Sequence, residues 1–171
     1  MRLIACAAAI ALSSCASVAP GDPVAPGPKL LSASAEVKSW GATLRSWMID
    51  EAGRVEHISG ERPGVPPASV TIEVRRLTLS EADRARLAAA VEKVEAILPT
   101  PEQCDERMTD GAYGTFRWDK GAGAKELKLD ANCVKGRDAE LMGAVFEADK
   151  IVDDAAKAVA PAERRPLANR S

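Results

Sequence analysis

The sequence predicts an α+β domain with two layers, an antiparallel sheet of about five strands and two helices packed on one of its faces. Three observations support this fold class. Two stretches of strand-forming residues double back over short turns, one further stretch alternates apolar and polar residues, and two longer stretches repeat apolar residues at helical spacing. The expected order is strand, strand, strand, helix, strand, strand, helix.

The first two strands are expected at Thr43–Asp50 and Val55–Gly60, which are rich in residues that favour strands. Gly53 lies in the short segment between them and can adopt the positive φ of a tight turn, so we expect a β-hairpin. Both alternating sets of side chains in this hairpin include apolar residues. The sequence therefore does not assign the face that points to the core.

A third strand is expected at Val70–Arg76, where apolar and polar residues alternate. This pattern is typical of a strand with one buried face and one face in water. The two sets of side chains are Val70, Ile72 and Val74 on one face, and Thr71, Glu73 and Arg75 on the other.

The first helix is expected to begin after Ser80, whose hydroxyl can accept a hydrogen bond from the first turn. Glu81 and Asp83 suit the positive end of the helix dipole, and Pro99 and Pro101 end the helix. Apolar residues recur at helical spacing and predict the buried face. They are Leu87, Val91, Val94 and Leu98.

A second hairpin and a second helix are expected to complete the domain. Tyr113–Asp119 places Phe116 and Trp118 on one face, the glycines near 121–123 turn the chain, and Lys125–Ala131 returns. Trp118 is therefore expected in the core. The second helix follows Gly136 and ends before Pro161. Its expected buried residues are Leu141, Val145, Ala148, Val152 and Ala155.

The N-terminal segment has the pattern of a secretory signal. Arg2 supplies a positive charge, and Leu3–Leu12 is apolar but shorter than the roughly 20 residues of a membrane-spanning helix. Leu12-Ser13-Ser14-Cys15 follows at once. This run resembles the lipobox of bacterial lipoproteins, in which an aliphatic residue and two small residues precede the cysteine; Ser14 stands where Gly or Ala is commoner.

The resemblance to bacterial lipoproteins implies that residues 1–14 are removed and that Cys15 carries the lipid. A diacylglycerol thioether and an acylated amine would give two or three chains, enough for stable anchoring. Ala16 in place of Asp implies, in Gram-negative lipoproteins, an outer-membrane location with the domain facing the periplasm. The alternative is an ordinary cleaved signal peptide with a chance cysteine.

The chain divides into a signal peptide (1–14), a lipid anchor and Pro-rich tether (15–39), a single α+β domain (40–160) and a flexible charged tail (161–171). Prolines and glycines in the tether favour extended chain, so a spacer is expected and a Pro-rich ligand is the alternative. The tether prolines are Pro20, Pro23, Pro26 and Pro28.

The sequence contains 4 cysteines. Cys6 would leave with the signal peptide, and Cys15 would carry lipid. Cys104 and Cys133 then form an even pair in an oxidising compartment, which favours a disulfide over two free thiols. They would be brought together because the second hairpin leaves and returns at the same end of the sheet.

Charge and motifs indicate neither nucleic-acid binding nor catalysis. Lys and Arg total 23 against 25 for Asp and Glu, whereas nucleic-acid-binding domains usually have a strongly basic face. His57 is the only histidine. Ser46 and Ser59 share its hairpin but lack a nucleophile elbow, and zinc would need further ligands. The sequence predicts no catalytic residue, no metal site and no cofactor.

Two residues are candidates for partner contact. Trp40, at the junction of tether and domain, suits an interface because tryptophan is enriched in binding hot spots. His57 is expected at the surface or in an interface. Trp47 is assigned to the core by default.

The order of elements resembles small bacterial envelope domains that have no assigned activity. We expect a non-catalytic binding or assembly-accessory module that contacts the membrane through Cys15 and binds another envelope protein. A tethered inhibitor of a secreted hydrolase is one form of this expectation. The alternative is an envelope or cell-wall hydrolase of unrecognised type, which would show a cleft with convergent polar groups.

Overall fold

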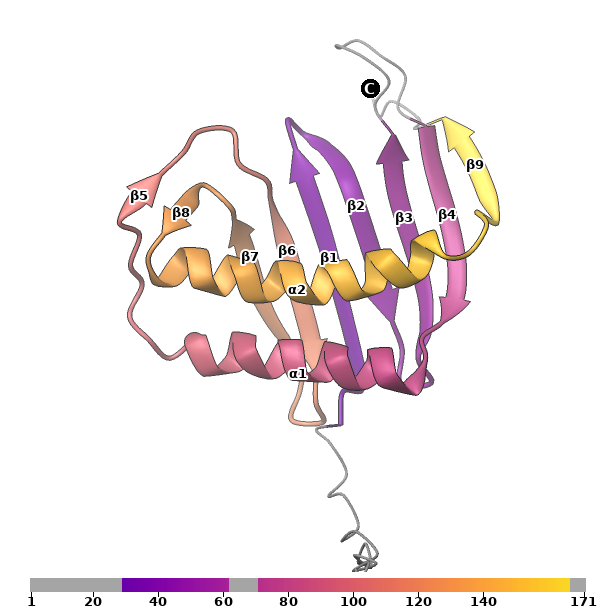
Figure 1. The fold of residues 1–171 in the computed structure, drawn as a ribbon, viewed down its shortest axis with the longest axis horizontal. Helices are drawn as coiled ribbons and strands as arrows, with labels where there is room; N and C mark the ends of the chain where they lie inside the picture. The colour runs from indigo at the N-terminus through magenta and orange to yellow at the C-terminus, as the bar shows by residue number, and fades with distance from the viewer. Residues whose placement is uncertain (1–28, 62–70, 167–171) are drawn as a thin grey trace, which may run out of the picture.

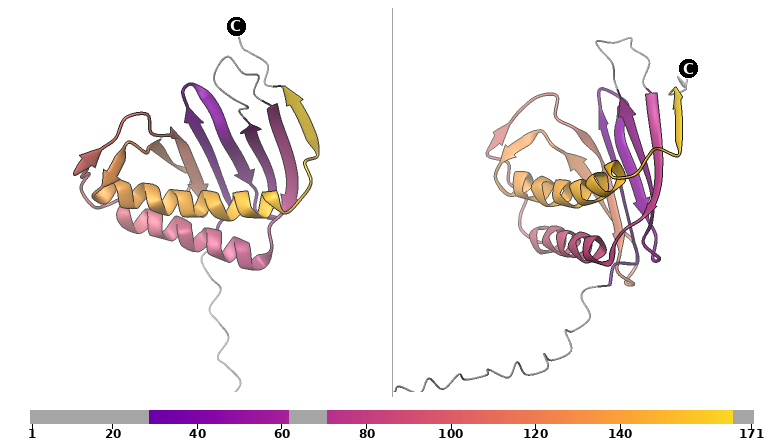
Figure 2. Two further views of the ribbon diagram at one scale, coloured as in Figure 1. Left: turned by 45° about the horizontal axis from the view of Figure 1, so that its top comes forward. Right: turned by 45° about the vertical axis from the view of Figure 1, so that its right-hand side comes forward.

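The computed structural model describes residues 29–61 and 71–166. The signal peptide, Cys15, the tether prolines and Val70 lie outside the described residues. A seven-stranded antiparallel sheet is covered on one face by two helices, and a separate two-stranded sheet lies beside them (Figure 1). Figure 2 shows in side view that both helices lie on the same side of the large sheet. The predicted α+β class is confirmed, with more strands than the sequence analysis expected.

The elements follow one another as β1 (Ser32–Ser39), β2 (Ala42–Ile49), β3 (Arg54–Glu61), β4 (Thr71–Thr78), α1 (Glu81–Ile97), β5 (Glu106–Arg107), β6 (Tyr113–Asp119), β7 (Lys125–Asp130), β8 (Cys133–Lys135), α2 (Arg137–Lys157) and β9 (Glu163–Pro166). The large sheet has the order β7-β6-β1-β2-β3-β4-β9, and β5 pairs with β8.

Both predicted hairpins, the third strand and both helices are present. The β2–β3 turn contains Gly53 at φ 81°, as its turn position requires. Helix α1 begins after Ser80, whose Oγ accepts a hydrogen bond from the Asp83 N–H at 3.1 Å. Helix α2 begins after Gly136.

Strand β1 is the main difference from the sequence analysis, which placed residues 15–39 in the tether and began the domain at Trp40. Ala33, Ala35 and Val37 alternate with polar residues in this strand and are only 3–4% exposed. Alanine is depleted in strands, so the pattern is weak in the sequence. The strand pairs with β2 on one side and β6 on the other, and it joins the two hairpins into one sheet.

Strand β9 is a second difference, because it lies in the segment 161–171 that was expected to be a flexible tail. It pairs with Thr71–Val74 of β4, and the Nε atom of Arg164 lies 2.7 Å from Glu73 Oε1. All residues of β9 are exposed, and their charged composition is typical of a disordered end. The pairing partner, rather than the local sequence, makes this segment a strand.

Strand β4 turns its polar residues toward the helices. Trp47 faces the core, His57 pairs with Trp47, and Arg75 pairs with His57, so all three side chains lie on the helix-covered face. Glu73 is on the same face and is 5% exposed. Alternation along a strand identifies the two faces but does not say which of them is covered.

The core lies between the sheet and the helices and is mainly aliphatic. Its aromatic part consists of Trp47, Phe116 and Trp118, so the predicted core positions of both tryptophans are confirmed. Phe116 stacks on Trp118 with ring centroids 5.4 Å apart and meets Trp47 edge to face at 6.2 Å. The helices contribute Leu87, Val91, Val94, Leu141, Val145, Ala148 and Val152.

The predicted disulfide pair is present. Cys104 and Cys133 are bonded, with their Cα atoms 5.7 Å apart. The pairing of Arg107 with Cys133 in the small sheet brings the two segments together. Because the two cysteines lie 29 positions apart in the sequence, the chain-entropy model gives the bond roughly 3–4 kcal/mol of stabilisation.

Replacing Leu87 or Val94 with Asp should strongly destabilise the fold. Both side chains are fully buried, and an unpaired charge there should lower the free energy of unfolding by at least about 3 kcal/mol. Glu92→Ala is the control, because Glu92 is exposed and its contact with Lys120 is a surface ion pair of small value. Thermal unfolding followed by circular dichroism tests this, and equal melting temperatures for all three variants would contradict the packing described.

Candidate functional site

A buried polar cluster lies between strands β2–β4 and the second half of α2. Sheet and helix side chains meet there on the covered face, beside the aliphatic core. We call it the polar cluster, and it consists of Arg45, His57, Glu73, Arg75, Asp149 and Asp153. Buried charges are costly unless they are paired, so the pairing of each member decides what the cluster does.

Asp149 is the best-paired member and is only 2% exposed. Its Oδ1 accepts hydrogen bonds from Arg45 Nε and Trp47 Nε1, each at 2.9 Å, and its Oδ2 contacts Arg45 Nη2. The two contacts from Arg45 make a bidentate pair, the strong form of this interaction. Asp149 therefore fixes α2 onto β2.

His57 and Asp153 form a second, looser contact. His57 is 1% exposed, and its Nε2 lies 3.2 Å from Asp153 Oδ1. The contact lacks hydrogen-bond geometry, and neither ring nitrogen of His57 has a hydrogen-bond partner among the described residues. Asp153 also contacts Lys157 Nζ at 2.6 Å and Arg45 Nη1 at 3.8 Å. Asp153 is thus held by flanking cations and does not depend on a charged histidine.

Glu73 and Arg75 complete the cluster at its β4 side. Arg75 Nη2 contacts Glu73 Oε2, and its Nη1 donates to Ser59 Oγ at 3.1 Å. The Nε of Arg75 donates to the carbonyl of Val159, just beyond α2, at 3.3 Å. Because Glu73 also contacts Arg164, these residues connect the end of α2 to both β4 and β9.

The pKa values reflect these surroundings. Burial lowers the pKa of His57 below its usual 6.5, and the attraction of Asp153 does not compensate. Burial acts to raise the pKa of Asp153, but the bond from Lys157 and the charge of Arg45 hold it below its usual value. The cluster is therefore organised around a neutral His57 between ionised carboxylates and guanidinium groups.

The prediction that His57 lies at the surface as a partner contact is wrong. The register of β2 and β3 places it opposite Trp47, beneath α2, where its side chain is buried. One signal was present in the sequence. Asp149 and Asp153, four residues apart, lie among the apolar residues of the second helix, and acidic residues on a buried stripe require cationic partners from the facing sheet.

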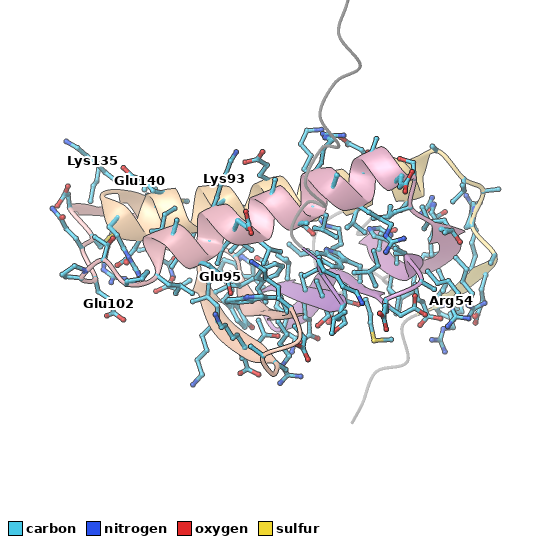
Figure 3. All side chains as sticks on the ribbon, turned by 90° about the horizontal axis from the view of Figure 1, so that it is seen from below. Arg54, Lys93, Glu95, Glu102, Lys135 and Glu140 are labelled. Carbon is cyan, nitrogen blue, oxygen red and sulfur yellow. A yellow bond between two sulfur atoms is a disulfide. The ribbon has the colours of Figure 1, made fainter. Side chains whose placement is uncertain are left out.

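A second ion cluster secures the β6–β7 hairpin to α1. The Glu95 carboxylate accepts hydrogen bonds from Lys125 Nζ at 2.6 Å, Trp118 Nε1 at 2.9 Å and Lys120 Nζ at 3.1 Å. Figure 3 shows Glu95 between the helix and the hairpin. The bonds from Lys125 and Trp118 lower the pKa of Glu95 to about 2. This contact fixes the position of β7 at the edge of the sheet.

Trp40 lies at the tip of the β1–β2 hairpin and is 75% exposed. It adopts φ 50°, followed by Gly41 at φ 77°. Positive φ values at both turn residues are typical of a tight hairpin, but asparagine or glycine is the usual residue at such positions. The Gly41 N–H donates to the hydroxyl of Tyr113, which is itself 41% exposed, at 3.0 Å. Trp40 and Tyr113 lie at the same end of the sheet, and the two residues are here called the aromatic tip.

Comparisons with known proteins add no family assignment. No protein-family model, no curated protein and no solved structure matches the chain. Among the described residues, no group of three or more His, Cys, Asp and Glu side chains could hold a metal ion. No helix within residues 29–61 and 71–166 has the length and apolar character needed to cross a membrane.

Stability should fall on mild acidification because of His57. Its pKa is lower in the folded than in the unfolded chain, so the unfolded chain binds more protons as the pH falls through 6.5. The stabilisation is fully present above that pH and is lost toward the lower folded pKa. Urea unfolding at several values between about pH 7.5 and pH 5 should show this loss. The carboxylates with lowered pKa values lose their contribution only at more acidic pH.

His57→Gln is the matched variant for this measurement. Glutamine retains a polar side chain that can donate to Asp153 but does not titrate. The variant should lose the pH dependence across this range while keeping the fold. An unchanged slope in His57→Gln would show that another group is responsible.

Proposed function

We propose that the protein is a lipid-anchored module that binds another envelope protein through the aromatic tip and carries no catalytic role. The observation that supports this most directly is Trp40, a large apolar side chain that is exposed and held at positive φ. Positive φ is unfavourable for a bulky residue and costs about 1–3 kcal/mol. A tryptophan at this position, where glycine would avoid the cost, favours a role for the side chain itself.

The arrangement of the tip suits a partner contact. Trp40 and Tyr113 are among the residue types enriched in interface hot spots. The hydrogen bond between Gly41 and the Tyr113 hydroxyl holds the hairpin end in place before binding. Preorganised aromatic side chains lose little conformational entropy on association, which favours affinity.

The position of the tip also fits a tethered molecule. The chain enters β1 at Ser32, and the tip follows its other end at Ser39. An eight-residue strand spans roughly 26 Å at about 3.3 Å per residue. The chain therefore enters the sheet at one end of β1, and the aromatic tip lies at the opposite end of this strand.

Trp40→Asn tests the role of the tip. Asparagine tolerates positive φ, so the variant should be as stable as the parent or more stable. We expect its free energy of unfolding to rise by up to about 1 kcal/mol, with an equal or higher melting temperature. A photo-crosslinking amino acid at Tyr113 in native envelopes should give a discrete protein adduct, identified by mass spectrometry. Trp40→Asn should abolish that adduct.

The control places the crosslinker at Lys150, an exposed position of α2 whose side chain is 72% exposed. This position should not give the same adduct. Identical adducts from both positions, or an adduct that persists in Trp40→Asn, would contradict a contact at the aromatic tip.

Cys15→Ser tests the anchor, which is proposed from the lipobox-like run before this residue. Serine has no thiol to accept the diacylglycerol group, so the variant should remain unprocessed or appear in the soluble fraction. Mass spectrometry and membrane fractionation measure this. A membrane-bound and normally acylated Cys15→Ser protein would contradict lipid attachment at this residue.

A further inference from the structure

Strand β7 is an open edge of the large sheet. It ends the strand order, and in the described part of the chain no strand pairs with its outer side. The Ala131 N–H donates to the Ala112 carbonyl, toward β6. Because alternate residues of an antiparallel ladder point to the same neighbour, the backbone groups of Glu126 and Lys128 point away from β6. They offer hydrogen bonds to a further strand.

A cavity lies directly beside this edge, between β7 and the first turns of α2. Its volume is about 200 Å³, smaller than the roughly 300–1,000 Å³ of sites for drug-sized ligands. Leu127, Leu141 and Met142 supply an apolar lining. The charged lining is balanced, with Arg107, Lys128 and Arg137 beside Glu102, Asp130 and Asp138. A space of this size suits single side chains of an extended chain. We call the edge and the cavity together the β7 groove.

Arg137 lines the groove with a side chain that is fixed by hydrogen bonds to neighbouring groups. Its side chain is only 10% exposed. Its Nη1 donates to Asp138 Oδ1, and its Nη2 donates to the carbonyl of Leu98, each at 2.8 Å. Its Nε is buried and has no partner among the described residues.

The helices project beyond β7 and limit which kind of chain can pair with its outer side. The ends of α1 and α2 and the small sheet extend past β7 (Figure 1), and Figure 3 shows this projecting end from below, with Glu102 on it. A second copy paired through β7 would bring its own helices to the same side of a continuous sheet, where the projecting layer already lies. A single extended segment brings no helices and meets no such obstacle.

We propose that the β7 groove binds an extended segment of the partner protein, which adds to the sheet as an antiparallel strand beside β7. This deepens the proposed function and rests on it, since the ligand is part of a partner protein. The segment places an apolar side chain opposite Leu127, beside the apolar lining of the cavity. On the other face it carries a basic residue opposite Glu126 and an acidic residue opposite Lys128. Edge-strand addition of this kind obtains affinity from backbone bonds and specificity from alternate side chains.

The groove lies next to the aromatic tip. Asp130, at the end of β7, pairs with Tyr113, which contacts the turn at Trp40–Gly41. A segment along β7 therefore continues toward the aromatic tip. Strand β6 lies between β7 and β1 in the sheet, so the tip and the groove are separate parts of the proposed contact.

A capped peptide with the sequence KELKLD, which copies residues 125–130, is a suitable probe. Paired antiparallel about Leu127, it places leucine opposite Leu127, lysine opposite Glu126 and glutamate opposite Lys128. Titration into the ¹⁵N-labelled domain, followed by NMR up to about 5 mM peptide, should give saturable shifts at the amides of Glu126 and Lys128. Absence of saturable shifts at these amides would overturn the proposal.

Lys128→Pro and Lys128→Thr separate backbone pairing from charge. Proline removes the outward N–H without breaking the ladder to β6 and should weaken binding by about tenfold or more. Threonine retains the N–H and should stay within about threefold of the original affinity. Both variants should melt close to the parent. Equal peptide affinities for the two variants would overturn strand addition. Self-association of the parent protein that Lys128→Pro abolishes would also overturn it, because the edge would then pair with a second copy.

The two proposals fail in distinguishable ways. Trp40→Asn should leave peptide binding unchanged, because Trp40 does not line the groove. A crosslinked partner that is lost in Trp40→Asn but fully retained in Lys128→Pro would support the aromatic tip and overturn the groove. Peptide binding without any specific adduct at Tyr113 would overturn the aromatic tip instead.

Discussion

The central position of β1 is the constraint on which the rest of the fold depends. Each predicted hairpin alone would be a two-stranded unit, which is marginally stable in water. β1 pairs with β2 and β6 at once, so the hairpins become parts of one sheet wide enough for two helices. Its inward residues Ala33, Ala35 and Val37 are small. They leave room at the centre of the sheet for the helices and for the aromatic side chains of the neighbouring strands.

The covered face of the sheet differs in chemistry on the two sides of β1. Toward β7 the covered face is aromatic and aliphatic, around Phe116 and Trp118. Toward β9 it is polar, and α2 is held there by Asp149 rather than by apolar packing alone. Replacing only one partner of such a pair leaves an uncompensated charge, which costs about 3–5 kcal/mol in buried pairs. The polar side therefore specifies the position of α2 more than it stabilises the fold.

Sequence patterns predicted those parts of the fold whose signal is local. Helix capping predicts the helix after Ser80, and alternation with turn glycines predicts both hairpins. The Cys104–Cys133 pair follows from the number of cysteines left once Cys6 and Cys15 are assigned. Strand β9 and the buried side of β4 depend on which segment lies opposite, and no local pattern contains that information. His57 illustrates the difference, because its burial follows from its register against Trp47. Trp40 was identified from residue type alone, but the positive φ that makes it informative is a property of the folded turn.

The placement of the aromatic tip on β1 has a mechanical consequence. A load applied at Trp40 and resisted at the N-terminal end of β1 passes along a single strand, from Ser39 to Ser32, whose backbone is already extended. Covalent bonds of that strand carry the tension, and no hydrogen bond between strands has to break for the force to be transmitted. A domain built in this way can bear a load at its exposed hairpin tip while its core and both helices stay unloaded.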